Sequence, residues 1–313
     1  MWRSAVQLRA GLRTGKPVSR GYSSVGRAPA LQAGGQEFES LYLHKIKTDH
    51  KDTSFDRSFY FFAMKLFERI AKFFYFTFLL ITSRNVPESI HHITLGELNF
   101  LYTVRGPENG KPVVLMHGNG GSHKSMATQQ IELAKSGYRV YCLDSRGQGD
   151  NVPLQEYHYA DMAEDCYLFI KALGLQKPVV GGWSDGGINA LLLEMAHPGT
   201  SSMIVVAGAN LTPECGDGFE QFKAWILEQG TPLVMMMLNE PQIEPEQLSV
   251  IPCPALVIAG SEDLISPEHT KLIADSIKDS ELVIVEGATH SSYIKKNPRL
   301  GKYMLDFMSR RGY

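Results

Sequence analysis

The 313-residue sequence is poor in cysteine, with four widely spaced residues and no C-x-x-C pair. Thiols spaced in this way do not match a zinc or redox site, and four in a chain this long do not make a disulfide framework. The chain also lacks any run of about 20 apolar residues, the length that a membrane-spanning helix needs. With 43% hydrophobic and 20% charged residues, it is neither fibrous nor wholly disordered.

The net charge is also small, at −2, but it is unevenly distributed. Residues 1–36 contain six basic side chains and no acidic one. The rest of the chain holds 25 basic and 33 acidic side chains, which amounts to about −8. A body of that sign gives no electrostatic reason to expect binding to nucleic acid.

Residues 1–54 are predicted to be disordered or to lie outside the natural protein. The first 40 residues are rich in Gly, Ala, Ser and Arg and show no hydrophobic period. This arginine-rich, acid-poor composition is typical of a mitochondrial transit peptide. Alternatively, residues 20–40 resemble the out-of-frame translation of a transfer-RNA gene, and the natural chain then starts near Met64. In both cases we expect no chemistry in this segment.

Residues 55–85 are predicted to form an aromatic, amphipathic helix. Nine of the 15 phenylalanines lie between Phe55 and Phe78. Charged residues recur at three- and four-residue spacing over 65–72, which places them on one helix face. Three interpretations are open: a helix on the membrane surface, an export signal without a cleavage site, and a helix packed on the body. We favour membrane contact through residues 59–82, so we expect a cytoplasmic or membrane-associated protein.

Residues 86–313 are predicted to form one α/β domain. Ile93–Leu95 and Leu98–Val104 predict a hairpin, and short apolar runs then alternate with helical patterns. The near-continuous hydrophobicity of these runs indicates strands buried on both faces, as in a parallel sheet. This order predicts a doubly wound α/β fold. The predicted strands are 112–116, 138–143, 178–183, 203–207, 255–259 and 282–285; the predicted helices are 124–136, 160–173, 187–197, 267–277 and 298–308.

The run Gly182-Trp183-Ser184-Asp185-Gly186 joins a predicted strand to a predicted helix. It is a G-x-S-x-G pattern in the strand–turn–helix context of a nucleophile elbow. Such a turn is so tight that only small residues fit two positions either side of the nucleophile, and Gly182 and Gly186 meet this demand. The pattern predicts Ser184 as a nucleophile whose hydroxyl stands above the edge of the sheet.

A serine nucleophile needs a base, and the base needs an orienting carboxylate. The order expected along the chain in this architecture is Ser, Asp, His. Asp263 and His290 each follow a predicted strand. Of the ten histidines, only His269 and His290 come after Asp263, and His269 opens a helix too near to reach back. We therefore predict His290 as the base and Asp263 as the acid, with two alternative acids, Glu262 and Glu286.

A glycine-rich loop, His-Gly-Asn-Gly-Gly-Ser at 117–122, follows the strand predicted at 112–116. Glycines let peptide N–H groups approach Ser184, as the developing oxyanion of acyl transfer requires. The predicted oxyanion donors are the backbone N–H groups of Asn119 and Asp185. A phosphate cradle is the alternative, but the loop matches neither G-x-x-x-x-G-K-[ST] nor G-x-G-x-x-G, so nucleotide binding is not expected. This chemistry needs no metal or organic cofactor, and none is predicted.

Together these motifs resemble the α/β-hydrolase family of serine hydrolases over about residues 91–308. Residues 144–149 are similar to the family's D-x-R-G-x-G loop, which we interpret as scaffolding. Residues 182–188 and 208–210 resemble the valacyclovir-hydrolase, or biphenyl-hydrolase-like, branch. The resemblance implies a mostly parallel sheet flanked by helices, with a short helical cap. It also implies that Asp185 holds the α-amino group of a substrate; the alternative is that Asp185 caps the following helix.

The cap is predicted at about residues 211–250. This segment has seven acidic residues and one basic residue, which suits cationic or neutral substrates. Phe222 and Trp225 have helical spacing, and Met236 adds flexible apolar surface. These three are candidate substrate contacts, with core packing as the alternative.

The leading hypothesis is a serine hydrolase that cleaves a carboxylic ester, aminoacyl or other small acyl, through an acyl-enzyme on Ser184. A C–C bond hydrolase or a thioesterase would use the same three side chains. A catalytically silent binding protein on the same scaffold is the alternative from another class. The expected partner is a small-molecule ester, and the oligomeric state stays open.

Overall fold

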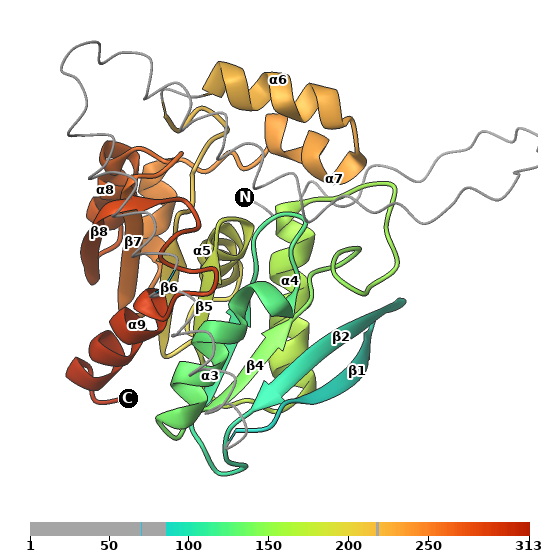
Figure 1. Ribbon diagram of the computed structural model, residues 1–313, viewed down its shortest axis with the longest axis vertical. Helices are drawn as coiled ribbons and strands as arrows, with labels where there is room; N and C mark the ends of the chain where they lie inside the picture. The colour runs from blue at the N-terminus through green and yellow to red at the C-terminus, as the bar shows by residue number, and fades with distance from the viewer. Residues whose placement is uncertain (1–69, 71–85, 217–218) are drawn as a thin grey trace, which may run out of the picture. The chain divides into compact units, whose positions relative to one another are not determined.

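A computed structural model describes residues 70, 86–216 and 219–313 (Figure 1). The predictions for residues 1–54 and for the helix at 55–85, with its membrane contact at 59–82, lie outside the described residues, Ile70 excepted. In the described part of the chain, no helix has the length and apolar character needed to cross a membrane. The predicted domain boundaries stay predictions.

Eight strands form one sheet in the order β1-β2-β4-β3-β5-β6-β7-β8. β2 pairs antiparallel with β1 and with β4, and every other pairing is parallel. The sheet thus confirms the predicted hairpin followed by a parallel α/β arrangement. The strands are β1 Ser89–Leu95, β2 Leu98–Arg105, β3 Pro112–Met116, β4 Arg139–Leu143, β5 Val179–Trp183, β6 Met203–Ala207, β7 Ala255–Glu262 and β8 Ser280–Thr289.

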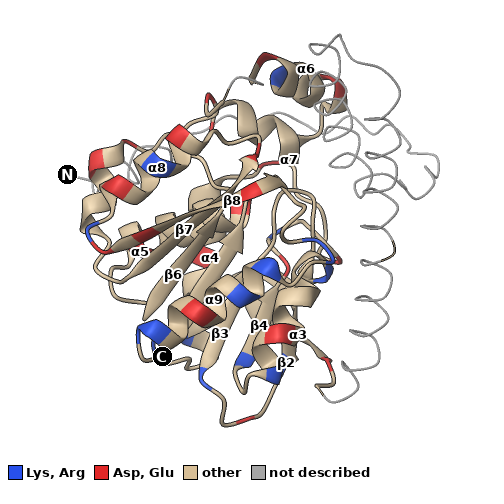
Figure 2. Ribbon diagram, turned by 60° about the vertical axis from the view of Figure 1, so that its left-hand side comes forward, with Lys and Arg blue, Asp and Glu red and all other residues tan. Residues whose placement is uncertain are grey.

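Helices follow most of the parallel strands and cover both faces of the sheet (Figures 1 and 2). They match the predicted helical patterns within a few residues, with two further helices in the segment between β6 and β7. The α-helices are α3 Ala127–Lys135, α4 Tyr159–Ala172, α5 Asp185–Ala196, α6 Phe219–Gln229, α7 Pro232–Met235, α8 Pro267–Ser276 and α9 Arg299–Arg310; short 3₁₀ turns lie at His123–Met126, Met236–Leu238 and Pro245–Val250.

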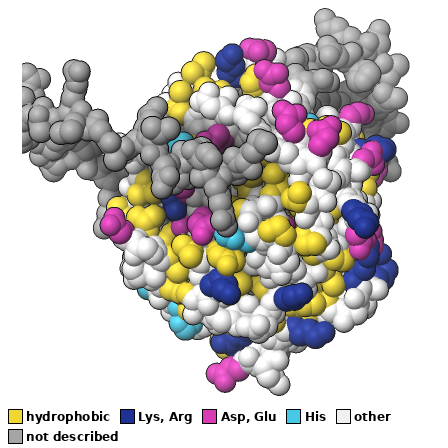
Figure 3. All heavy atoms as spheres, turned by 180° about the vertical axis from the view of Figure 1, so that it is seen from behind, with side chains coloured by type: hydrophobic (Ala, Val, Ile, Leu, Met, Phe, Trp, Pro, Cys, Tyr) yellow, Lys and Arg dark blue, Asp and Glu magenta, His cyan; other side chains and the backbone are white. Residues whose placement is uncertain are grey.

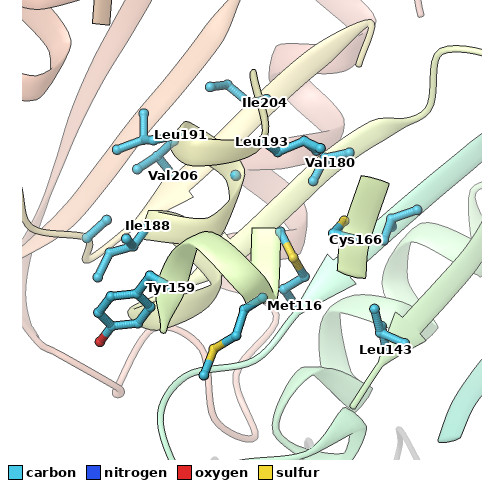
Figure 4. Close-up of a cluster of buried hydrophobic side chains, with 14 of the residues drawn as sticks. Met116, Leu143, Tyr159, Cys166, Val180, Ile188, Leu191, Leu193, Ile204 and Val206 are labelled. Carbon is cyan, nitrogen blue, oxygen red and sulfur yellow. The ribbon is translucent and has the colours of Figure 1, made fainter. Parts of the chain in front are cut away.

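Two apolar clusters hold the helices to the sheet. On one face, Phe169 of α4, Leu191 of α5 and Ile273 of α8 are fully buried in a single cluster. Figure 4 shows part of this cluster, with Leu191 labelled. On the other face, Leu133 of α3 and Phe307 of α9 are equally buried in a second cluster. The side chains of a strand alternate between its faces, so each strand from β3 to β7 contributes to both clusters, whereas the buried residues of β8 belong to the second alone. This double burial is the physical reason for the near-continuous apolar runs in the sequence.

Most charged side chains lie on helices, loops and strand ends, and β5 and β6 carry none (Figure 2). In the view from behind, apolar side chains are interspersed with polar and charged ones (Figure 3). Among the exposed large apolar residues are Ile90, Val152 and Leu227, which belong to separate segments of the fold. Residues exposed singly in this way are ordinary for a protein surface.

The last two strands are longer than predicted. The apolar runs at 255–259 and 282–285 end early, but β7 continues to Glu262 and β8 to Thr289. The pairing of β7 with β8 shifts register between Gly260 and Glu262, and a Cβ on Gly260 would lie 1.9 Å from the carbonyl oxygen of Ala288. β8 is the last strand of the sheet, so polar side chains near its end can remain exposed to solvent. The pairing of β7 with β8 therefore continues beyond the apolar runs.

The segment between β6 and β7 contains α6 and α7, which lie beyond one end of the sheet (Figure 1). α6 contacts α7 and the turn Met236–Leu238, and within α6 only Ile226 is buried. At the two ends of this segment, Leu211 and Ile243 belong to the first apolar cluster. The Ile243 amide donates a hydrogen bond to the Leu211 carbonyl oxygen. This segment corresponds to the predicted cap.

Candidate active site

Ser184 lies in the turn between β5 and α5. Its backbone has φ 56° and ψ −119°, a conformation that a non-glycine residue adopts only when the surroundings impose it. The amides of Gly187 and Ile188 donate to the Ser184 carbonyl oxygen at 2.8 and 3.1 Å, which starts the helix directly after the turn. The side chain of Ser184 is half-buried.

The two glycines of the elbow are required by backbone contacts. A Cβ on Gly182 would lie 2.0 Å from the backbone carbon and oxygen of Gly186. A Cβ on Gly186 would lie 2.4 Å from the carbonyl oxygen of Met116 at the end of β3. Any side chain at either position would therefore push main chain against main chain, and the turn could not keep its shape.

The structure brings Ser184, His290 and Asp263 together although they are far apart in the sequence. His290 Nε2 lies 3.1 Å from Ser184 Oγ, and His290 Nδ1 lies 2.6 Å from Asp263 Oδ1. A carboxylate only accepts hydrogen bonds, so the ring proton belongs on Nδ1 and Nε2 is free to accept from the serine hydroxyl. Glu262 and Glu286, the alternative acids, have exposed side chains.

Asp263 is held by its own loop directly after β7. Its side chain is 5% exposed and accepts hydrogen bonds from the amide of Ile265 at 3.1 Å and from that of Gly260 at 3.4 Å. These bonds hold a carboxylate that burial alone would destabilise. The position of the Asp263 carboxylate therefore does not depend on its contact with His290 alone.

Two residues that the sequence did not single out as site residues shape the position of His290. The indole N–H of Trp183 donates to the His290 carbonyl oxygen at 2.9 Å. Gly208 follows β6 with φ +57°, and a Cβ there would lie 3.1 Å from His290 Cε1 and 3.4 Å from Asp263 Oδ2. The glycine thus leaves room for the imidazole. Its place immediately after a predicted strand was the available signal.

The glycine-rich loop after β3 approaches the nucleophile closely. A Cβ on Gly118 would lie 3.0 Å from the Cβ of Ser184. The Gly120 amide donates to Gln148 Oε1 at 2.9 Å, and the Gly121 amide donates to the Gly118 carbonyl oxygen at 3.0 Å. Small residues in this loop therefore let its backbone lie beside the serine, as the predicted role requires.

A buried histidine ties this loop to the neighbouring loop after β4. His117 Nδ1 lies 2.8 Å from the Gly118 carbonyl oxygen, and the amide of Ser145 donates to His117 Nε2 at 3.0 Å. One ring nitrogen donates and the other accepts, so the ring is neutral. Burial lowers the pKa of His117, in agreement with this neutral form. This role of His117 was not predicted from the sequence, although the residue begins the glycine-rich run.

The loop at 144–149 is built as scaffolding. Asp144 is fully buried and accepts hydrogen bonds from the backbone and ring nitrogens of His123. Arg146 donates to both carboxylate oxygens of Asp165 on α4, at 2.6 and 2.8 Å. These contacts anchor the loop on both sides and leave Ser184 to other residues.

Asp185, the residue after the nucleophile, is buried and doubly bonded. Its side chain is 2% exposed; Tyr159 Oη donates to Oδ1 at 2.9 Å and Asn119 Nδ2 donates to Oδ2 at 3.0 Å. Burial raises the pKa of Asp185 to about 6, and these two hydrogen bonds oppose that rise. The structure thus joins Asn119 and Asp185, the two predicted oxyanion residues, through their side chains. Tyr159 was not identified from the sequence.

The three candidate substrate contacts lie in the segment between β6 and β7. Phe222 and Trp225 stack on one another in α6, with ring centroids 6.0 Å apart. Met236 is buried in the same apolar cluster as Leu233 and Ile243. Packing within the fold accounts for Met236, and contact of any of the three with a substrate stays a prediction.

No group of three or more His, Cys, Asp or Glu side chains in the described ranges is arranged to hold a metal ion. The four cysteines are unpaired thiols. Burial raises the pKa of Cys166 and Cys253 to about 12, so neither is a thiolate near neutral pH. Ser184 is thus the nucleophile candidate that has a base beside it.

Known proteins resemble this chain in sequence and fold. The family model described as alpha/beta hydrolase fold matches residues 111–232. The AB hydrolase superfamily protein YisY of Bacillus subtilis is 26% identical over 64% of this chain and 92% of its own length. The human serine hydrolase BPHL is 27% identical over 64% of this chain and 80% of its own length.

Solved structures share the fold. A thermophilic esterase from Thermogutta terrifontis superposes with a TM-score of 0.59 at 20% identity, covering 71% of this chain and 98% of the esterase chain. At that level of identity the likeness concerns the arrangement of strands and helices. Its share of this chain approximates the part that carries β1 to α9.

Proposed function

Because the chain belongs to the α/β-hydrolase family, we propose that it is a serine hydrolase that cleaves small carboxylic esters. The observation that carries the proposal is the hydrogen-bonded triad of Ser184, His290 and Asp263, in which Ser184 lies at a strained turn. A serine hydroxyl is a weak nucleophile, and an adjacent base oriented by a carboxylate makes it reactive. The three members of the triad follow different strands, β5, β7 and β8, at the same edge of the sheet.

The first half of the reaction forms an acyl-enzyme. His290 Nε2 accepts the Ser184 proton while Oγ bonds to the ester carbonyl carbon, whose oxygen becomes an oxyanion. The backbone N–H groups of Asn119 and Asp185 donate hydrogen bonds to that oxyanion. His290 then gives its proton to the leaving alkoxide oxygen as the ester C–O bond breaks. Asp263 remains a carboxylate and stabilises the imidazolium.

The second half repeats these steps with water. His290 accepts a proton from a water molecule whose oxygen bonds to the acyl carbon. The second tetrahedral species collapses when the bond to Ser184 Oγ breaks, and His290 returns the proton to Oγ. The carboxylic acid leaves and the enzyme returns to its starting state, so protons and bonds balance without a cofactor.

The class of ester follows from the contacts of Asp185. Both of its carboxylate oxygens already accept hydrogen bonds and the side chain is 2% exposed. A substrate ammonium group could reach it only by displacing Asn119 or Tyr159. We therefore propose simple acyl esters as the main substrates and retain aminoacyl esters as a comparison class.

Labelling with a fluorophosphonate probe tests the nucleophile. We expect the full-length protein to be labelled covalently and the Ser184→Ala variant to be unlabelled, because the probe bonds to an activated serine oxygen. Circular dichroism and thermal melting of the variant establish that it is folded. Equal labelling of the two proteins would overturn the proposal.

A substrate panel then separates ester hydrolysis from the other chemistries that the same side chains support. The panel contains p-nitrophenyl acyl esters, aminoacyl esters, acyl thioesters and a C–C bond substrate. We expect the simple acyl esters to have the highest kcat/KM. Turnover of only the thioesters or the C–C substrate would contradict the ester proposal, and labelling without any turnover would favour the binding-protein alternative.

A further inference from the structure

The Asp185 carboxylate connects the two residues whose N–H groups would receive the oxyanion. Asp185 supplies one of these donors, and its side chain accepts a hydrogen bond from the Asn119 side chain at 3.0 Å. The residues are 66 positions apart in the sequence: Asn119 lies in the loop after β3, and Asp185 begins α5 directly after Ser184. A single side-chain contact thus spans the proposed oxyanion site.

The loop that carries Asn119 needs such a contact. Three of its four residues, Gly118 to Gly121, are glycines, and Gly120 has φ +62°. Glycine loses more conformational freedom than any other residue when it is ordered, so a glycine-rich loop is intrinsically loose. Asn119 is the one residue in this run with a side chain to hold it. An oxyanion site stabilises a transition state only when its donors are already aimed.

We infer that Asp185, held by Tyr159, is a positioning residue that fixes Asn119 so that its backbone N–H points at the oxyanion. The inference rests on the proposed ester hydrolysis. It gives Asp185 a side-chain role different from contact with substrate. Asn119 is half-buried, whereas Asp185 is buried.

Tyr159 is itself anchored from the cap segment. It is the first residue of α4, and its amide donates to Glu240 Oε2 at 3.0 Å. Glu240 Oε1 lies 2.6 Å from His158 Nδ1. Glu240 therefore accepts from two consecutive residues at the start of α4 and holds the tyrosine whose hydroxyl bonds Asp185. The chain of contacts runs from the cap segment through Tyr159 and Asp185 to Asn119.

The charge of Asp185 provides a readout that packing alone would not change. Its pKa is raised by burial to about 6, and Tyr159, Asn119 and His290 act in the lowering direction. Tyr159 from α4 and His290 from the loop after β8 are the titratable groups that act on it. Above pH 6 the ionised carboxylate accepts from both donors; as the pH falls through 6 it gains a proton and the contact with Asn119 weakens. His290 must also be neutral to act as a base. Protonation of either Asp185 or His290 therefore lowers kcat on the acid side of the pH profile.

A double-mutant cycle tests the contact between Asp185 and Asn119. Asn119→Ala keeps the backbone N–H and removes the side-chain hydrogen bond to Asp185, which we call the tether. Asp185→Asn places an amide N–H₂ against one of the two donors. We expect each variant to lower kcat for a simple acyl ester about 10- to 100-fold, with KM changed less than about threefold. Because both act through the same contact, the double variant should lose no more than the worse single one.

Tyr159→Phe tests the support of Asp185. Loss of the hydroxyl removes a hydrogen bond that lowers the pKa of Asp185, so the acid limb of kcat should move to higher pH. Activity at high pH should stay near that of the parent protein. Tyr138→Phe is the matched control: Tyr138 Oη donates to the Tyr313 carbonyl oxygen at 3.1 Å, at the amino ends of the strands, and its pH profile should not move.

Three results would overturn the inference. These are additive losses in the cycle, an unshifted profile in Tyr159→Phe, or a rise in KM confined to aminoacyl esters, which would indicate an ammonium anchor instead. If the parent protein hydrolyses no ester, the proposed function fails and kinetics say nothing of the tether. Carboxyl-labelled NMR titration of Asp185 in the full chain then decides, because Asn119→Ala and Tyr159→Phe should each raise its pKa if the contacts exist.

Discussion

Replacement of His290 by glutamine is expected to lower kcat for ester hydrolysis by about 10⁴- to 10⁶-fold. His290 Nε2 lies 3.1 Å from Ser184 Oγ and is positioned to carry the proton in both halves of the proposed reaction. A glutamine amide can still donate to Asp263, so the buried carboxylate keeps a partner and the fold should survive. Steady-state kinetics with p-nitrophenyl acetate measure the effect, and thermal melting checks the fold.

His269→Gln is the matched control for that substitution. His269 also follows Asp263 in the chain, and its Nε2 accepts from the amide of Leu211 at 2.9 Å. Burial lowers the pKa of His269, so the ring is neutral there and a glutamine carbonyl oxygen can replace the acceptor. Its kcat should stay within about threefold of the parent value. A comparable loss in both variants would refute the assignment of His290 as the base.

The three side chains of the triad should also act as one unit. Combining Ser184→Ala with His290→Gln is expected to lower the rate no further than either single change, because a base without a nucleophile, or the reverse, supplies little. A residual rate above that in water would then report on the backbone donors alone. Multiplying losses would mean that Ser184 and His290 work in separate steps.

Gly182→Ala should destabilise the protein by about 3 kcal/mol or more and abolish activity. The new Cβ would lie 2.0 Å from the backbone carbon and oxygen of Gly186, and neither group can rotate away as a side chain could. Either β5 or the start of α5 has to move, and Ser184 lies between them. Urea denaturation gives the stability change, and fluorophosphonate labelling reports whether the serine is still reactive.

Gly174→Ala serves as its counterpart. Gly174 has φ +63° and nothing within 4 Å of a Cβ, so alanine there meets backbone strain without overlap. That strain costs about 1–2 kcal/mol, and labelling of Ser184 should be unaffected. If both glycine substitutions had the same cost, the close approach at the elbow would not be what requires Gly182.

Much of the fold could be predicted from local patterns. β3 and β6 agree residue for residue with the apolar runs, because strands buried on both faces must be apolar throughout. β7 and β8 were predicted too short because Ser261, Glu262 and Glu286 interrupt the apolar pattern near their ends, where the two strands still pair with each other. Pairing between strands that are distant in sequence leaves no local mark on such residues.

The site divides in the same way. The sequence by itself singled out Ser184, because a G-x-S-x-G turn needs a glycine two positions either side of the serine, and it ordered Asp263 and His290 after successive strands. Only the tertiary structure decided that Asp263 rather than Glu262 or Glu286 bonds the imidazole, and that Asp185 is enclosed by Tyr159 and Asn119. The physical reason is range: steric rules of a turn act between neighbours, whereas burial and hydrogen bonding depend on which loops the parallel sheet brings to one edge.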